Sequence, residues 1–208
     1  MPNYHKPLIP GETYHLFSRA VGSEKLFKSN ENYRYFLSKC ITHTARVADY
    51  FAYALIPNHF HLLARIKPAE VIIPFYEEKK QKPFDPLHTE LSDFIMERYS
   101  NWLNGYTKAF NKMYNRKGAL FMDYLRRSHA LSDRDFCNFI FYVHKNAVHH
   151  GLTKTIGDWK WDSYNSIISH LPTQLQREDI LQFFGGHDPF IKFHDRKIFI
   201  KQGDWEDV

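Results

Sequence analysis

The apolar and polar positions in the first third of the chain predict a strand, a helix and two further strands. Residues 13–21 are rich in β-prone side chains, which predicts the first strand. From residue 31 to 47 apolar side chains recur at helical spacing, and Asn30 is expected to cap this amphipathic helix. The continuous apolar run 51–56 predicts a central strand, and after a Pro-Asn break residues 59–66 predict its neighbour.

The middle of the chain is less regular. Residues 68–90 are expected to form an inserted loop, because prolines and a run of charged residues interrupt any periodic pattern. Residues 92–114 predict a long helix, and residues 119–125 predict a short strand after a glycine. A capping box at Ser132 predicts the start of a last helix, which Gly151 is expected to end.

This order of elements predicts an α+β fold. A ferredoxin-like or RRM-like architecture requires such an order, with an antiparallel sheet, helices on one face and the other face free for a ligand.

Composition and charge narrow the function classes. Of the 208 residues 43% are hydrophobic, which is enough for a packed core, and the net charge of +5 favours an anionic partner such as nucleic acid. Only Cys40 and Cys137 are present, so we expect neither a disulfide framework nor a cysteine zinc site, as suits a cytoplasmic protein. No apolar run has the length of a signal peptide or a membrane span, so no membrane partner is expected.

Two pairs of polar residues are candidates for chemistry. His59 and His61 alternate in a predicted strand, so both imidazoles project from one face, where they can hold a metal. Tyr142 and Asn146 lie one turn apart on the polar side of the last helix. The patterns alone leave other interpretations open: structural histidines held by hydrogen bonds, a tyrosine at the edge of the core, and an ordinary polar residue late in a helix.

Four motifs in order carry a resemblance to a known family. They are Tyr14-His15-Leu16-Phe17-Ser18-Arg19, Pro57-Asn58-His59-Phe60-His61-Leu62-Leu63, Gly118-Ala119-Leu120-Phe121 and the ten residues from Tyr142 to Gly151. The chain resembles the single-tyrosine HUH transposases of small insertion sequences and is most similar to their REP-associated tyrosine transposase branch. The similarity covers roughly residues 13–170. Residues 1–170 are therefore expected to form the catalytic domain, and residues 171–208 a C-terminal extension.

The resemblance implies a role for each candidate residue. His59 and His61 would bind a divalent metal, Mg²⁺ or Mn²⁺, with Asn146 as a third ligand. Tyr142 would be the nucleophile. The branch usually has Asn-Pro where this chain has Asn146-Ala147, but the spacing from tyrosine to asparagine is unchanged.

The implied activity is that of a transposase that nicks and rejoins single-stranded DNA through a 5′-phosphotyrosine, at hairpin or REP-like ends. No phosphate-binding loop motif occurs, in agreement with chemistry that needs no nucleotide cofactor. Family members can pair and share active sites between subunits, so a homodimer is one expected assembly.

The basic segment of residues 105–127 is expected to contact the DNA. The cations of this segment, together with Arg19 of the first motif, form the predicted DNA-binding set: Arg19, Lys108, Lys112, Arg116, Lys117, Arg126 and Arg127. The density of positive charge also fits an ordinary solvated face. Phe121 and Tyr124 are candidates for stacking on unpaired bases, although burial of Phe121 in the core is the simpler interpretation.

Three alternatives compete with a transposase. The first is a non-catalytic RRM-like nucleic-acid-binding protein, which would use aromatic residues on an exposed sheet face, or a domesticated DNA-binding relative of the transposases. The second is a metal phosphoesterase that activates water; its two-histidine type needs His-x-Thr or His-x-Ser twice, and the chain contains neither. The third is a carboxylate nuclease, although no acidic residue stands beside the histidines in the predicted strands.

Overall fold

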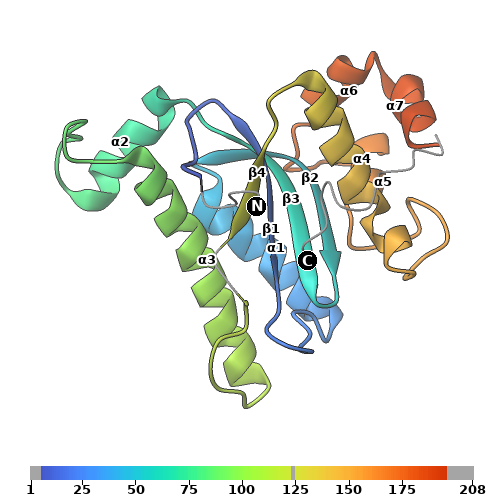
Figure 1. Ribbon diagram of the computed structural model, residues 1–208, viewed down its shortest axis with the longest axis horizontal. Helices are drawn as coiled ribbons and strands as arrows, with labels where there is room; N and C mark the ends of the chain where they lie inside the picture. Colours follow the sequence, from blue (N-terminus) through green and yellow to red (C-terminus); the bar gives the residue numbers. More distant parts are fainter. Residues whose placement is uncertain (1–5, 123–124, 196–208) are drawn as a thin grey trace.

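The computed structural model describes residues 6–122 and 125–195 (Figure 1). Its elements in chain order are β1 (Thr13–Arg19), α1 (Asn30–Thr44), β2 (Ala48–Ile56), β3 (His59–Ile66), α2 (Ala69–Lys80), α3 (Leu91–Met113), β4 (Arg126–His129), α4 (Asp133–His149), α5 (Tyr164–Ile168), α6 (Arg177–Phe184) and α7 (His187–His194). In the described part of the chain, no helix is long and apolar enough to cross a membrane.

The four strands form one antiparallel sheet in the order β2-β3-β1-β4. Strand β3 pairs with both β1 and β2, and β4 pairs with the other edge of β1. This is the strand order of a ferredoxin-like sheet, so the predicted α+β class is confirmed.

Alternation along β3 sends neighbouring side chains to opposite faces of the sheet. Phe60 points to the face that α1 and α3 cover, where its ring lies 5.1 Å from Phe36 and 5.4 Å from Trp102. His59 and His61 therefore point to the second face. The apolar stripes of α1 and α3 bury one face of the sheet and leave the histidine face for another element.

The sequence predicts that the second face of the sheet is free for a ligand. In the structure this face is covered, because α4 lies across β2 and β3 there (Figure 1). In the figure α3 and α4 lie on opposite sides of the sheet. The reason is the apolar stripe of α4: Phe139, Ile140 and Val143 are fully buried, and the helix contacts β2 and β3 of the sheet.

The ends of α4 agree with the sequence prediction. The Ser132 side chain accepts a hydrogen bond from the backbone N–H of Asp135, which caps the first turn. Gly151 follows the last turn with φ of +67°, a left-handed conformation that glycine adopts without a steric penalty. These two signals set the length of the helix that carries Tyr142 and Asn146.

The predicted loop 68–90 is wrong for its first half, which forms α2 in spite of Pro74 within it. Pro68 precedes the first turn, where a missing N–H costs nothing, and the helix is held by its apolar side. Phe75 and Tyr76 are buried, and their rings lie 5.5 and 5.2 Å from the Phe94 ring of α3. Tertiary packing here outweighs the helix-breaking composition.

Two further local predictions are corrected. Residues 119–125 were expected to form the fourth strand, but β4 comes afterwards, at Arg126–His129, and Phe121 makes only an isolated bridge to Ala20. Residues 123–124 lie outside the described part of the chain. The cap of α1 is Ser29 rather than Asn30, because the side chain of Asn32 reaches back to the backbone N–H of Ser29 and completes a capping box.

Beyond residue 170, helices α6 and α7 pack against α4. The Phe193 ring of α7 lies 5.9 Å from Phe141, and the Phe183 ring of α6 lies 4.9 Å from Phe136. The buried core continues without interruption from the sheet to Phe190 of α7. The α6 and α7 helices therefore support the outer side of α4.

Candidate active site

The site begins with the two histidines of β3. His59 and His61 are buried, with 1% and 0% of their surface exposed, and their ring centroids lie 5.1 Å apart. Both face α4 for the reason given above. A pair of buried imidazoles on one strand face needs partners, because a buried polar nitrogen without one costs free energy.

Asn146 of α4 supplies one of these partners. It is fully buried, and its Oδ1 lies 2.9 Å from His59 Nε2. On the other side of the same ring, Asn58 Oδ1 lies 2.9 Å from His59 Nδ1. Each ring nitrogen of His59 thus lies beside an amide oxygen, and the donor role can pass from one nitrogen to the other.

Tyr142 lies one helical turn before Asn146 and is half-buried. Its ring centroid is 5.2 Å from that of His61, with the two rings edge to face. The tyrosine from α4 and the histidines from β3 therefore meet within a single chain. Tyr142 is thus less buried than the two histidines and Asn146.

The structure adds a residue to which the sequence assigned no role. His15 of β1 is 1% exposed, and its Nε2 lies 2.9 Å from Nδ1 of His61. The register explains this contact: Phe17 pairs with His61, and His15 lies two residues along the same face. The alternation of the first strand together with its pairing to β3 is the signal that finds His15, but the pairing is not visible in the sequence.

Burial keeps these imidazoles neutral. Desolvation lowers the pKa of His15 to about 3 and that of His61 well below its ordinary value. Desolvation also lowers the pKa of His59 to about 4, although the hydrogen bond with Asn146 opposes it. At neutral pH the site therefore presents neutral imidazoles, which is the form of histidine that metal ions bind.

The donor set fits a divalent metal. The buried His61 Nε2 and Asn146 Nδ2 have no hydrogen-bond partner among the residues that the structure describes. His59 Nε2 and Asn146 Oδ1 are 2.9 Å apart, close to the spacing of about 3 Å between adjacent ligands of an octahedral ion held at about 2.1 Å. No three His, Cys, Asp or Glu side chains form a metal group within residues 6–122 and 125–195. Two imidazoles and one amide would leave the remaining positions to water or phosphate.

The predicted DNA-binding cations fall into two groups. Lys108, Lys112 and Lys117 are exposed, and Arg19 is partly exposed and pairs in register with His59. The three arginines of the set that remain are less available to solvent. Arg116 donates hydrogen bonds to Glu24 and to the carbonyls of residues 118 and 119. On β4, Arg127 is buried and donates to the Lys6 carbonyl, and Arg126 is half-buried. Phe121 packs against Phe60 and Phe36 in the core, and Tyr124 lies outside the described residues.

Comparison with known proteins supports the fold. No model of a protein family matches the chain, and no curated protein matches it. Among solved structures, a REP-associated tyrosine transposase bound to a REP hairpin is similar with a TM-score of 0.59 and 16% sequence identity, covering 83% of this chain and 89% of that one. The chain has the fold of a REP-associated tyrosine transposase. The likeness that the four sequence motifs indicated is thus matched in three dimensions, at an identity that shows the fold alone.

A second buried histidine pair lies on the outer side of α4. His144 Nδ1 is 2.9 Å from His194 Nε2 of α7, and His144 Nε2 is 2.8 Å from the Ser163 hydroxyl. His194 Nδ1 donates to the carbonyl of Phe190, which makes His194 Nε2 the acceptor for His144. The Ser163 hydroxyl then donates to His144. This chain of hydrogen bonds joins α7 to α4, and because Ser163 is fully buried it is a structural link rather than a hydrolytic site.

We expect the stability of the protein to fall in mild acid because of this link. Burial lowers the pKa of His194 from 6.5 to about 4, against smaller opposing effects of the Phe190 carbonyl and Asp195. The unfolded chain therefore binds more protons between pH 6.5 and 4, and stability falls as the pH decreases through that range, by up to about 1.4 kcal/mol per pH unit for this group. Chemical unfolding at several pH values measures the slope. His194→Gln should have a smaller slope than the wild type, whereas His170→Gln, at an exposed position, should not; equal slopes in all three proteins would contradict this account.

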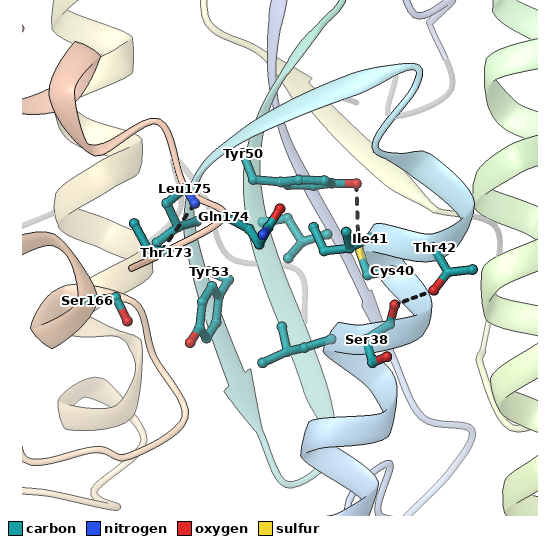
Figure 2. A pocket seen from close by; sticks show the side chains of 12 residues that line it. Ser38, Cys40, Ile41, Thr42, Tyr50, Tyr53, Ser166, Thr173, Gln174 and Leu175 are labelled. Atoms are coloured by element: carbon teal, nitrogen blue, oxygen red, sulfur yellow. Dashed lines mark hydrogen bonds between the residues drawn. The ribbon is translucent and has the colours of Figure 1, made fainter. Parts of the chain in front are cut away.

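The structure also has a pocket of about 470 Å³ away from the histidines, between α1 and β2 and lined on one side by residues 173–175 (Figure 2). Cys40 is its one thiol, and Figure 2 shows the Tyr50 hydroxyl directed at it, 3.4 Å away. Burial raises the pKa of Cys40 to about 11, so the thiol stays protonated at neutral pH and is a poor nucleophile. The pocket therefore does not compete with the histidine site for the chemistry.

Proposed function

We propose that this protein is a metal-dependent transposase that nicks and rejoins single-stranded DNA through a 5′-phosphotyrosine on Tyr142. The observation that carries the proposal is the meeting of three side chains in one chain: the Tyr142 ring lies 5.2 Å from His61, and the Asn146 amide lies 2.9 Å from His59. The similar solved structure is a tyrosine transposase bound to a REP hairpin, which supports hairpin or REP-like DNA as the target.

The reaction requires charge neutralisation. A phenol has a pKa of about 10 and a phosphodiester is an anion, so tyrosine attacks it poorly without help. His59, His61 and Asn146 would hold Mg²⁺ or Mn²⁺, which when bound would withdraw charge from a non-bridging phosphate oxygen. Imidazole ligands make Mn²⁺ at least as suitable as Mg²⁺.

Tyr142 acts as the nucleophile in this proposal. Its oxygen forms a bond to phosphorus and loses its proton to solvent, while the bond from phosphorus to the 3′-oxygen breaks and that oxygen takes up a proton. The phosphate ester is conserved in the 5′-phosphotyrosine, so a 3′-hydroxyl can attack it and rejoin the strand with no nucleotide cofactor. The half-buried position of Tyr142 suits a group that must reach an incoming strand.

Substrate binding would use the exposed cations. Residues 120 and 122 form backbone hydrogen bonds with Val21 and Arg19, so the loop that follows Lys117 adjoins the end of β1 that pairs with His59. Arg19 and Lys117 are therefore the cations best placed to bind phosphates next to the scissile bond. The proximity of Tyr142 and His61 within one chain supports cleavage by a single subunit, and the homodimer stays a prediction.

The non-catalytic RRM-like alternative is less compatible with this arrangement. An RRM binds RNA on an open sheet face with exposed aromatic residues. Here α4 covers that face, and the side chains beneath it include buried histidines, of which His61 has no partner for its Nε2 among the residues that the structure describes. Simple binding would not need this arrangement.

The test is incubation of the protein with single-stranded DNA that carries a hairpin next to a single-stranded flank, in the presence of Mn²⁺, followed by a denaturing gel. We expect a protein band shifted by the mass of the attached DNA and a matching shortened DNA fragment. EDTA and a fully duplex DNA of the same sequence serve as controls. Failure to form an adduct with any of a panel of hairpin-flanked strands, by a protein that binds them, would refute the proposal.

A further inference from the structure

His15 contacts the site but has no part in the chemistry proposed above. It is buried, and its Nε2 lies 2.9 Å from Nδ1 of the candidate ligand His61. We propose that His15 is a positioning residue that accepts a hydrogen bond from His61 Nδ1–H and thereby keeps the lone pair of His61 Nε2 available to a metal ion. This inference rests on the proposed function, since it assumes that His61 is a ligand.

The direction of the hydrogen bond follows from the inventory of donors. A neutral imidazole has one N–H group and one lone pair, so in the contact between His15 and His61 one ring donates and the other accepts. If His15 donated, His61 Nε2 would carry a hydrogen that has no acceptor among the described residues, and this nitrogen would be unable to bind a cation. If His61 donates, its Nε2 presents a lone pair towards the site.

Only the second arrangement suits a metal ligand. Histidine ligands in proteins almost always donate their second ring N–H to a neighbouring acceptor, which fixes the tautomer and the ring orientation. The acceptor is commonly a carboxylate, a backbone carbonyl or water. In the described part of the chain, the partner of His61 Nδ1 is instead the imidazole of His15 on the neighbouring strand.

The surroundings of His15 hold its ring in place for this role. Its ring is stacked at 4.9 Å on Phe17 and at 5.0 Å on His61, and it lies 5.1 Å from Phe139. Its edge also contacts Tyr142 at 5.6 Å. Contacts on several sides restrict rotation of the ring, so the acceptor nitrogen stays directed at His61. His15 thus touches both a candidate ligand and the candidate nucleophile from a position on β1.

Mn²⁺ binding to the untagged full chain without DNA tests the inference independently of activity. His15→Phe keeps an aromatic ring but removes the acceptor, and we expect it to weaken Mn²⁺ binding by about 10- to 100-fold in electron spin resonance titrations. His15→Gln offers an amide oxygen as acceptor and should restore part of the affinity. The control is His129→Phe on β4, whose ring stacks on Tyr14 outside the site and whose loss should not change the affinity.

Nitrogen-15 NMR of the metal-free wild-type protein gives a readout that a purely structural role of His15 would not produce, because a metal on Nε2 would by itself leave the hydrogen of His61 on Nδ1. We expect His61 to carry its hydrogen on Nδ1 before any metal is bound; a hydrogen on Nε2 in the metal-free protein would overturn the inference even if His15→Phe fails to fold. His59→Ala separates the two levels of the argument. If it binds Mn²⁺ as the wild type does, the metal site of the proposed function is wrong. If it loses Mn²⁺ while a folded His15→Phe retains full affinity, only the role of His15 is wrong.

Discussion

Replacing Tyr142 with phenylalanine is expected to abolish the covalent protein–DNA adduct while binding of hairpin DNA stays at the wild-type level. The substitution removes one oxygen and keeps the ring, whose edge-to-face contact with His61 at 5.2 Å needs no hydroxyl. Removal of the nucleophile in an enzyme with a covalent intermediate lowers the rate by at least about three orders of magnitude. A denaturing gel measures the adduct, and a mobility shift measures DNA binding.

The matched control for this variant is Tyr35→Phe. Tyr35 is an exposed tyrosine on α1, behind the opposite face of the sheet, so loss of its hydroxyl should leave adduct formation unchanged. An adduct of full size in the Tyr142 variant would show that another residue attacks the DNA. Tyr124 is then the next tyrosine to replace; it lies outside the residues that the structure describes.

The parts of the fold that the sequence predicted well are those with local signals. The boundaries of β3 are the predicted ones, because a Pro-Asn break precedes an unbroken run of extended character. The start of α4 follows from Ser132 and Asp135, whose mutual capping depends only on residues three apart. Because these two elements carry the candidate ligands and the candidate nucleophile, the sequence also predicted the proximity of most residues of the candidate site.

The parts that the sequence missed depend on contacts between distant segments. The β4 strand is short and polar and exists because it pairs with the open edge of β1, so no apolar run marks it. Helix α2 contains Pro74 and is stabilised by burial of Phe75 against α3. His15 becomes part of the site only through the register of β1 on β3. In each case the decisive partner lies far away in the sequence.

The number of cations in a segment of the sequence does not show which of them are available to bind DNA. Arg116 belongs to a dense basic segment, but its guanidinium binds Glu24 and two backbone carbonyls. Arg127 is buried under the N-terminal segment, where it donates to the Lys6 carbonyl. The sequence shows how many cations a segment has, whereas the structure shows which of them point to solvent. Among the predicted set, the exposed lysines are the ones that mutagenesis should address first.

Replacing either candidate ligand histidine with alanine is expected to remove divalent-ion dependence together with activity. His59 and His61 are buried, so alanine at either position leaves a cavity in place of the imidazole. Loss of one of the three proposed protein ligands leaves two, which weakens the binding of the ion. We expect DNA cleavage to fall by at least about 100-fold, and the residual cleavage to be insensitive to EDTA.

This second substitution needs a control for folding, because an alanine at a buried histidine also creates a cavity. His59→Gln and His61→Gln fill more of the space with a polar side chain, and a melting curve identifies which variants are folded. The exposed His88 of the segment between α2 and α3 provides the matched control, since His88→Ala removes an imidazole far from β3 and should keep wild-type cleavage and Mn²⁺ stimulation. A folded His61 variant that still cleaves DNA faster when Mn²⁺ is added would show that the metal is held by other residues. Asn146 and His150 would then be the residues to replace, since the ring of His150 lies 4.6 Å from that of His59.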